Sequence, residues 1–198
     1  MARTPDPSRK PELIEQILDY LLDKSLSSVT FRSLAAGIGV STFTLVYHFG
    51  TRADLISEVV QAISVRSGIV EELNQEPEAT LDTFVQGLQL SWEWSIQPRN
   101  RQLQRLEFEA GMLESLHPDQ LTFTRALYRH WVDIGVEAMV KFGMDPEDAE
   151  AEARVVVNAF HGLQYDLVLN NDVAAATRSF ERALDQHKSR IEHVIGMG

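Results

Sequence analysis

Apolar positions recur at helical spacing along almost the whole chain. In the first such stretch they lie three, four, seven and eight positions from the first, at Ile14, Ile17, Leu18, Leu21 and Leu22. This period matches one face of an α-helix, and no run of alternating β-branched residues between tight turns indicates a strand. The pattern predicts an all-α protein of about nine helices.

The first 58 residues predict a small domain of short helices. One helix begins at Pro11, and a second opens at Val29-Thr30 and is broken by residues 37–40. A third starts after Ser41, a favourable N-cap, and ends near Phe49; the pair Gly50-Thr51 separates it from a helix running to about Glu72. Two short helices joined by a glycine-containing turn and braced by an amphipathic helix are typical of a helix-turn-helix domain. We therefore expect a DNA-binding domain over residues 1–58.

Residues 59–198 predict a second, larger helical domain. A segment from Asn74 to Thr80, with Pro77 inside it, marks the boundary of the helices that follow. Five helical patterns come after it, each bounded by proline, glycine or a capping residue. The first spans about residues 81–96, and the second carries residues 103–113 and ends at His117-Pro118. The other three span about residues 120–142, 145–170 and 173–195.

Composition limits the classes of protein that fit. The 198 residues contain no cysteine, no apolar run long enough for a membrane span, and no apolar segment typical of a secretory signal, so a cytoplasmic location is expected. The formal net charge is −11, which opposes DNA binding at first sight. Its distribution softens that objection: residues 1–52 carry six basic and five acidic side chains, so the negative charge lies in the rest of the chain. This balance predicts modest non-specific affinity for DNA.

The ordered motif in the first domain is more specific than its charge. The runs 30–41 (TFRSLAAGIGVS) and 47–55 (YHFGTRADL) resemble the signature of the TetR family of transcriptional regulators, over about residues 11–60. The resemblance implies a ligand-responsive regulator, in the usual case a repressor, that binds a palindromic operator as a homodimer. A small-molecule effector would release the dimer from double-stranded DNA. It would do so by shifting the population towards a conformation in which the two DNA-binding domains, the heads of the dimer, are spaced differently.

The same resemblance assigns DNA contacts to individual residues. Arg32 matches a position that reaches guanine in the major groove, and Thr42 and Phe43 match base-edge positions. Arg52 matches a phosphate contact at a helix N-terminus. Phe43 and Val46 depart from the residues usual there, and His48 fits a packing role as well as a reading role. The expected DNA-binding residues are Thr30, Arg32, Ser41, Thr42, Phe43, Thr44, Val46, Tyr47, His48, Thr51 and Arg52.

For the larger domain, the resemblance implies an effector pocket among its middle helices and a dimer interface on its last two helices. The alternative for either set is an ordinary place in the core of one chain. Expected pocket residues are Trp92, Trp94, Phe108, Met112, Phe123, Leu127, Trp131, His161 and Tyr165. Expected interface residues are Val156, Phe160, Leu163, Leu167, Phe180 and Leu184.

Two other classes of function were weighed. A di-iron or similar bundle enzyme usually needs two Glu-x-x-His motifs, and only Glu114 and His117 have that spacing. Phosphate loops and nucleophile elbows are also missing from the sequence, so no enzyme, cofactor or metal site is expected. A helical ligand-binding or partner-binding module without DNA affinity remains the alternative. Steep salt dependence of promoter binding would separate the two.

Overall fold

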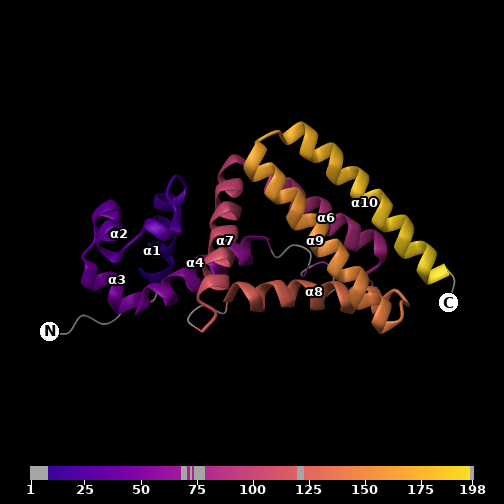
Figure 1. The fold of residues 1–198 in the computed structure, drawn as a ribbon, viewed down its shortest axis with the longest axis horizontal. Helices are drawn as coiled ribbons and strands as arrows, with labels where there is room; N and C mark the ends of the chain where they lie inside the picture. The colour runs from indigo at the N-terminus through magenta and orange to yellow at the C-terminus, as the bar shows by residue number, and fades with distance from the viewer. Residues whose placement is uncertain (1–8, 68–70, 72, 74–78, 120–122, 197–198) are drawn as a thin grey trace. The chain divides into compact units, whose positions relative to one another are not determined.

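A computed structural model describes residues 9–67, 71, 73, 79–119 and 123–196. These residues form nine α-helices and no strand, which confirms the predicted all-α class (Figure 1). The chain makes two compact units: unit 1 comprises residues 1–64 and 106–124, and unit 2 comprises residues 65–105 and 125–198. Within the described parts of the chain, no helix is both long and apolar enough to cross a membrane.

Unit 1 is built around the first four helices. They are α1 (Arg9–Leu21), α2 (Phe31–Ile38), α3 (Thr42–Phe49) and α4 (Arg52–Ser67), with a 3-10 turn, η1 (Leu26–Ser28), between α1 and α2. Helix α1 packs against α2, and α2 packs against α3. Apolar residues at helical spacing bury one face of each element, so the unit has its own core. That core contains Leu13, Ile17, Leu18, Leu21, Leu34, Leu45, Phe49, Leu55, Val59 and Ile63.

Local hydrogen bonds fix the turn between α2 and α3. Thr30 caps α2 by accepting a bond from the Ser33 amide at 3.1 Å, while the Ser33 hydroxyl accepts from the Thr30 amide at 3.0 Å. Gly39 ends α2 in the left-handed conformation, at φ 72°, where a side chain would be strained. Ser41 then caps α3 by accepting from the Thr44 amide at 3.0 Å, as the sequence predicted. The start and the direction of α3 are therefore set within twelve residues.

Unit 2 contains the five helical patterns predicted after residue 80. They are α6 (Leu81–Ser95), the first part of α7 (Pro98–Leu116), α8 (Phe123–Lys141), α9 (Pro146–Asn170) and α10 (Val173–Gly196). Asp145 caps α9 by accepting from the Glu147 amide at 3.0 Å, and Pro146 occupies the first turn. The expected ends at Glu72 and Gln120, and most of the boundary segment at residues 74–78, lie outside the described residues.

Aromatic stacking and an ionic link hold α6, α9 and α10 together. The Trp92 ring stacks on Phe180 at 4.7 Å between centroids, and Phe160 meets both rings edge-on. Near the end of α10, the Arg190 guanidinium donates to the buried carboxylate of Glu152 on α9 at 2.7 Å. Helix α10 folds back along α9 after only two residues, so these two helices form an antiparallel pair (Figure 1).

Glu107 on α7 gives a prediction about stability and pH. Burial raises the pKa of its carboxyl to about 7 from an ordinary 4.5. The folded state thus binds the proton more tightly than the unfolded state does. The resulting contribution to the free energy of unfolding is fully present below pH 4.5 and is lost as pH rises through about 7. Because the side chain stays partly accessible, we expect Glu107→Gln to raise the free energy of unfolding at pH 8 by only about 1–2 kcal/mol.

Urea denaturation at pH 8 and pH 4.5 measures this effect. At pH 4.5 wild type and variant should unfold at similar denaturant concentrations, because the carboxyl is neutral or nearly so in the folded protein. Glu181→Gln on α10, an exposed position, is the control and should leave the difference between the two pH values unchanged. A gain of the same size at both pH values would contradict the titration of Glu107.

Candidate functional site

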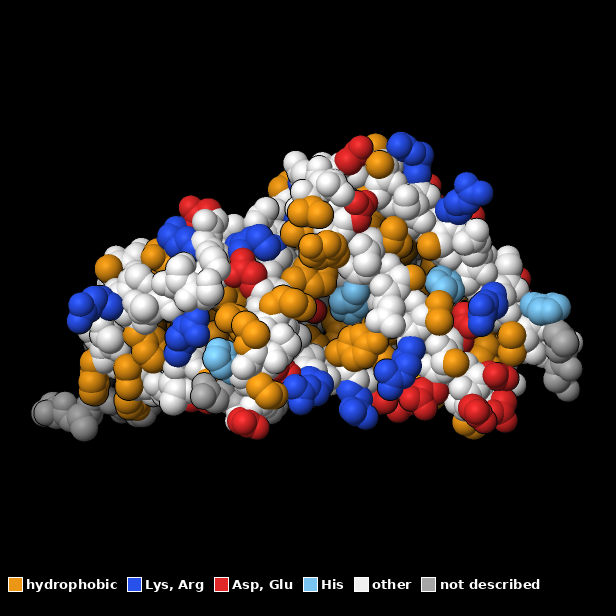
Figure 2. All heavy atoms as spheres, in the orientation of Figure 1, with side chains coloured by type: hydrophobic (Ala, Val, Ile, Leu, Met, Phe, Trp, Pro, Cys, Tyr) orange, Lys and Arg blue, Asp and Glu red, His pale blue; other side chains and the backbone are white. Residues whose placement is uncertain are grey.

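Helix α3 divides cleanly into a packed face and an exposed face. Leu45 and Phe49 are buried against the core of unit 1, while Thr42, Phe43 and Tyr47 face outward. Phe43 is 78% exposed and Tyr47 is 61% exposed, and their rings stack with centroids 6.4 Å apart. Hydrophobic side chains project from the end of unit 1 at which α3 lies (Figure 2). Stacked aromatics left in solvent on a short helix indicate a surface that meets a partner.

The other predicted DNA-binding residues lie on or near this face and differ in exposure and in their contacts within the chain. Arg32 on α2 and Val46 on α3 are exposed. Thr44 and His48 are half-buried, and the His48 ring meets Tyr47 edge-on at 5.0 Å. Thr30 and Ser41 are the N-caps of α2 and α3, so their hydroxyls are already engaged with backbone amides. Arg32, Thr42, Phe43, Val46 and Tyr47 are thus exposed and do not cap α2 or α3, whereas Thr30 and Ser41 are exposed but engaged as caps.

Arg52 and Thr51 have partners inside the chain. The Arg52 guanidinium donates from Nε to the Val29 carbonyl at 3.0 Å and from Nη2 to the Leu26 carbonyl. Thr51 donates its hydroxyl to the Asp54 carboxylate at 2.7 Å and its amide to the same oxygen at 2.9 Å. These two bonds hold the pKa of Asp54 below its ordinary value. The N-terminus of α4 is thus capped by the chain itself, and Arg52 joins it to η1.

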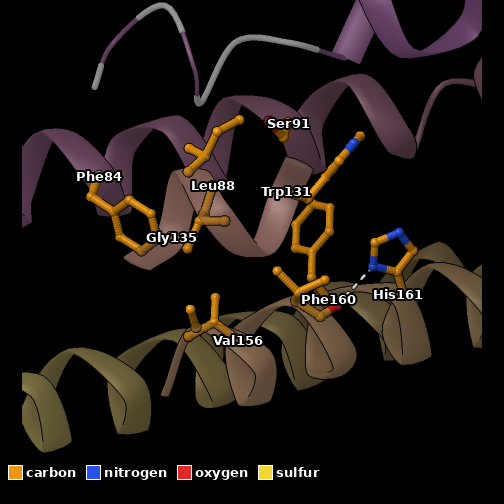
Figure 3. Close-up of a pocket in the computed structure, with 11 residues that line it drawn as sticks. Phe84, Leu88, Ser91, Trp131, Gly135, Val156, Phe160 and His161 are labelled. Carbon is orange, nitrogen blue, oxygen red and sulfur yellow. Dashed lines mark hydrogen bonds between the residues drawn. The ribbon is translucent and has the colours of Figure 1, made fainter. Parts of the chain in front are cut away.

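An apolar cavity lies in unit 2 between α6, α8 and α9. The space inside it that the centre of a water molecule can reach is about 40 Å³, room for roughly three waters without movement of side chains. Figure 3 shows Phe84 and Leu88 of α6 facing Val156 and Phe160 of α9, with Trp131 of α8 beside them. Its lining is Phe84, Leu88, Ser91, Trp131, Ile134, Gly135, Ala153, Val156, Val157, Phe160 and His161.

Close packing of α8 on α9 shapes one wall of this cavity. A Cβ built at Gly135 would lie 3.0 Å from the Cβ of Ala153, closer than side chains normally approach. The small residues at these two positions therefore let the helices approach closely and leave the space beside Trp131 and Phe160. A larger residue at position 135 would push α8 from α9.

Two polar groups line the cavity. His161 contacts the Val157 carbonyl through Nδ1 at 2.8 Å; a carbonyl only accepts, so Nδ1 carries the hydrogen. Burial lowers the pKa of His161, although the bond to Val157 partly opposes this, and the ring is neutral near pH 7. Ser91 is buried, and within the described part of the chain its Oγ has no hydrogen-bond partner.

The predicted pocket residues are scattered. Trp131 and His161 line the cavity, whereas Trp92 is packed in the aromatic core with its Nε1 donating to the Thr177 hydroxyl at 3.1 Å. Phe108, Met112 and Phe123 belong to unit 1. Trp94, Leu127 and Tyr165 are in unit 2 but not in the cavity lining, and Tyr165 is exposed. Ser91 was missed, although its place seven residues after Phe84 and three after Leu88 puts a hydroxyl on an apolar helix face.

The residues predicted for the dimer interface lie mainly on the packed sides of α9 and α10. Five of them are buried within one chain, and Leu163 is half-buried. Part of their surface is covered by intrachain contacts, such as that of Phe160 with Phe180. The opposite face of α9 is exposed instead, in a stripe spaced alternately four and three residues apart. This α9 stripe consists of Ala151, Val155, Asn158, Gly162, Tyr165 and Leu169.

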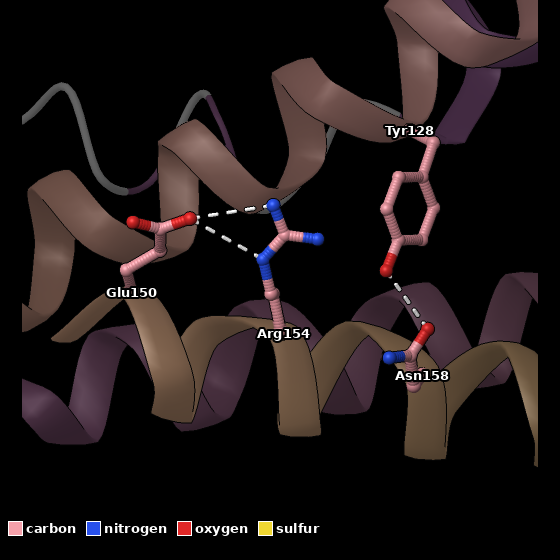
Figure 4. Close-up of polar contacts among 4 residues, drawn as sticks. All are labelled: Tyr128, Glu150, Arg154 and Asn158. Carbon is pink, nitrogen blue, oxygen red and sulfur yellow. Dashed lines mark hydrogen bonds and ion pairs between the residues drawn. The ribbon is translucent and has the colours of Figure 1, made fainter. Parts of the chain in front are cut away.

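A second hollow lies on the outer face of α8 and α9. It is larger, about 480 Å³, and its lining combines arginines and carboxylates with a few apolar side chains. Glu150 and Arg154 pair at 3.3 Å within it, and beside it the Tyr128 hydroxyl donates to the Asn158 amide oxygen at 2.9 Å (Figure 4). Such polar contacts are typical of a solvated surface groove. The smaller cavity has instead the apolar lining that is typical of small-molecule sites, so it is the better candidate for a ligand site.

Comparison with known proteins finds likeness of structure rather than of sequence. No protein-family model matches the sequence, and no curated protein matches it. A transcriptional regulator from Rhodococcus sp. RHA1 superposes with a TM-score of 0.74 at 15% identity, covering 93% of this chain and 96% of that one. SmeT in complex with triclosan gives 0.74 at 14% identity, covering 92% and 91% of the two chains.

A TetR variant from Acinetobacter baumannii AYE, solved with minocycline, covers 97% of this chain and 99% of its own, with a TM-score of 0.63 at 18% identity. A putative TetR-family regulator from Rhodococcus sp. gives 0.66 at 17% identity, covering 96% and 100% of the two chains. The likeness spans both units of the chain. The protein therefore has the all-α fold of the TetR-family transcriptional regulators.

Proposed function

We propose that this protein is a TetR-family transcriptional repressor, which binds a palindromic operator as a homodimer and is released by a small-molecule effector. The observation that carries the proposal is the exposed face of α3, a capped helix whose packing residues all lie on its other side. A recognition helix needs this division, because one face must anchor it while the other enters the major groove. The TetR-like fold supports the proposal, as does the motif at residues 30–55.

In this proposal α3 reads the bases and α2 supplies one arginine. Thr42 and Phe43, in the first turn of α3, approach base edges, where Phe43 offers only apolar contact, for instance to a thymine methyl. Arg32 donates two hydrogen bonds to one guanine, and the Tyr47 hydroxyl donates a hydrogen bond to phosphate. Arg52 takes a positioning role in this proposal, because its Nε and Nη2 donate to the carbonyls of Val29 and Leu26.

Unit 2 would hold the effector in its apolar cavity. SmeT and TetR were solved with triclosan and minocycline, so proteins of this fold take small molecules with ring systems. A ligand that prefers one conformation of the body would move α4 and change the spacing of the two DNA-binding heads. Heads that no longer match successive major grooves would lose affinity for DNA, and the coupling would be reciprocal.

The dimer in this proposal is formed by the α9 stripe together with its symmetry mate. Leu169 is 65% exposed and Tyr165 is 55% exposed, and the small residues Ala151 and Gly162 allow a second helix to approach closely. The spacing of the stripe is that of helix packing in bundles. A single head reads too few base pairs for useful specificity, which is why two are needed.

Selection of bound DNA from a random pool tests the function. The expected product is a palindrome whose half-sites are separated by about one helical turn or a multiple of it. Binding to that product should weaken steeply as salt is raised. Recovery of no enriched sequence, together with binding that is insensitive to salt, would leave a ligand-binding or partner-binding module and overturn the proposal.

Arg32→Ala should weaken binding to the selected operator by about 1–3 kcal/mol and relax the preference at one base pair per half-site. The reason is the loss of a bidentate contact to guanine O6 and N7. Titration of the operator and of single-base variants by fluorescence anisotropy measures both effects. Arg178→Ala on α10, another exposed arginine, is the control and should bind as wild type. Equal weakening on every sequence would make Arg32 a phosphate contact instead.

A further inference from the structure

The hydroxyl of Ser91 is oriented unlike that of its neighbour one turn further along α6. Ser95 donates its hydroxyl to the Ser91 carbonyl at 2.7 Å, the usual arrangement of a serine inside a helix. The Ser95 oxygen also accepts from the Gln104 amide at 2.7 Å and from the Gln164 amide at 3.0 Å. Ser95 is therefore fully engaged within the protein.

The Ser91 hydroxyl, in contrast, makes no hydrogen bond of the kind that the Ser95 hydroxyl makes. Ser91 is 3% exposed, lines the cavity, and its Oγ has no partner among the described residues. A buried hydroxyl without a hydrogen bond is costly, and most such groups in proteins find a partner. A bound molecule in the cavity would supply one.

The remaining lining restricts the charge of that molecule. None of the eleven lining residues is Asp, Glu, Lys or Arg, and the one titratable side chain, His161, is neutral near pH 7. An ionised ligand would lose its hydration without gaining a counter-charge, which costs far more than a single hydrogen bond returns. The aromatic rings of Trp131 and Phe160 and the aliphatic side chains around them favour a flat apolar body.

From these features, and resting on the effector role proposed above, we propose that the cavity takes a neutral, ring-containing ligand that presents a hydroxyl or similar polar group to Ser91 Oγ. Ser91 is then the residue that selects for the polar group, while the apolar lining provides most of the affinity. Phenol and toluene have nearly the same shape and differ by the hydroxyl, so they separate these two contributions. Benzoate has the same ring with a negative charge.

Titration of the full-length protein with each probe in the absence of DNA tests the inference, followed by the indole NMR signal of Trp131 or by calorimetry. We expect Ser91→Ala to weaken phenol binding by about two- to tenfold while toluene binding changes by less than about twofold or improves. Benzoate should bind neither protein measurably. Ser189→Ala, an exposed position on α10, should change none of the three titrations.

Stability supplies an independent readout that confirms the folded state. Ser91→Ala removes an unpartnered hydroxyl and should keep or raise the melting temperature. Ser95→Ala removes the acceptor of two buried amides and should lower it, without altering the ratio of phenol to toluene affinity. This contrast separates the selecting serine from the structural one.

Three results would overturn the inference. Equal changes for phenol and toluene in Ser91→Ala would mean that an ordered water satisfies the hydroxyl. Benzoate binding as tight as phenol binding would remove the requirement for neutrality. A lack of binding by phenol and toluene would remove the ligand class. Ser91-dependent phenol binding that leaves operator affinity unchanged would instead refute the effector role while upholding the site.

Discussion

Gly162→Arg should break the proposed dimer and lower affinity for the operator selected from a random pool by about 100-fold or more. Gly162 lies in the middle of the α9 stripe, and a Cβ built there meets no atom within 4 Å in the single chain. The arginine therefore fits the folded monomer, and replacing a mid-helix glycine stabilises the helix by about 0.8–1 kcal/mol. In a dimer it would place two like charges in the contact, and the affinity gained from joining two heads would be lost.

Sedimentation velocity at micromolar concentration measures the first effect, and anisotropy titration of the operator measures the second. Ala126→Arg, at an exposed position on α8, adds the same charge outside the stripe and should stay dimeric with wild-type affinity. Because an added arginine attracts DNA, a fall in affinity cannot come from charge alone. A Gly162→Arg protein that sediments as a dimer would contradict this interface, and a monomeric wild type would contradict the dimer itself.

Trp92→Ala should lower the free energy of unfolding by about 3–5 kcal/mol, the usual cost of removing a large aromatic side chain from a core. The Trp92 ring is 2% exposed, stacks on Phe180 with an interplanar angle of 5°, and donates its Nε1 hydrogen to Thr177. Urea denaturation followed by circular dichroism measures the loss. We expect Thr177→Val to remove only about 1 kcal/mol, because it breaks the hydrogen bond and leaves the stacking in place.

Trp94 is the matched control because it lies two residues away on the same helix and is half-buried. Trp94→Ala should cost markedly less than Trp92→Ala. If Trp92→Ala does not fold, Trp92→Phe keeps an aromatic ring and should lose about 1–2 kcal/mol, which preserves the comparison. Equal losses at positions 92 and 94 would contradict the assignment of Trp92 to the core rather than to a ligand site.

The parts of the fold predicted well are those encoded by neighbouring residues. Ser41 as an N-cap, a helix break within residues 37–40, and Asp145-Pro146 as a helix start each act through bonds to neighbouring residues. Each is found in the structure, which places the break at Gly39. The helical period likewise depends only on local spacing. Such features can be read from a sequence because no distant part of the chain is needed to produce them.

Features that depend on distant contacts were harder to predict. The motif suggested that Arg52 meets phosphate, but its contacts with Leu26 and Val29 depend on how α4 meets the turn after α1. Hydrophobic spacing showed that Val156 and Phe160 need cover, yet it could not show that α10 of the same chain supplies it. The α9 stripe escaped notice because Ala151, Asn158 and Gly162 carry little hydrophobic signal.

The division of α3 into a packed face and an exposed face also bears on solubility and on change of specificity. Substitutions at Thr42, Phe43 and Tyr47 alter the outer face without touching Leu45 or Phe49, so the binding preference of the proposed recognition face can drift while the fold is preserved. The same arrangement leaves the rings of Phe43 and Tyr47 exposed to water in the free protein, which favours association between molecules. A net charge of −11 opposes that association through mutual repulsion. The acidity of the chain thus helps to keep free molecules of the protein apart.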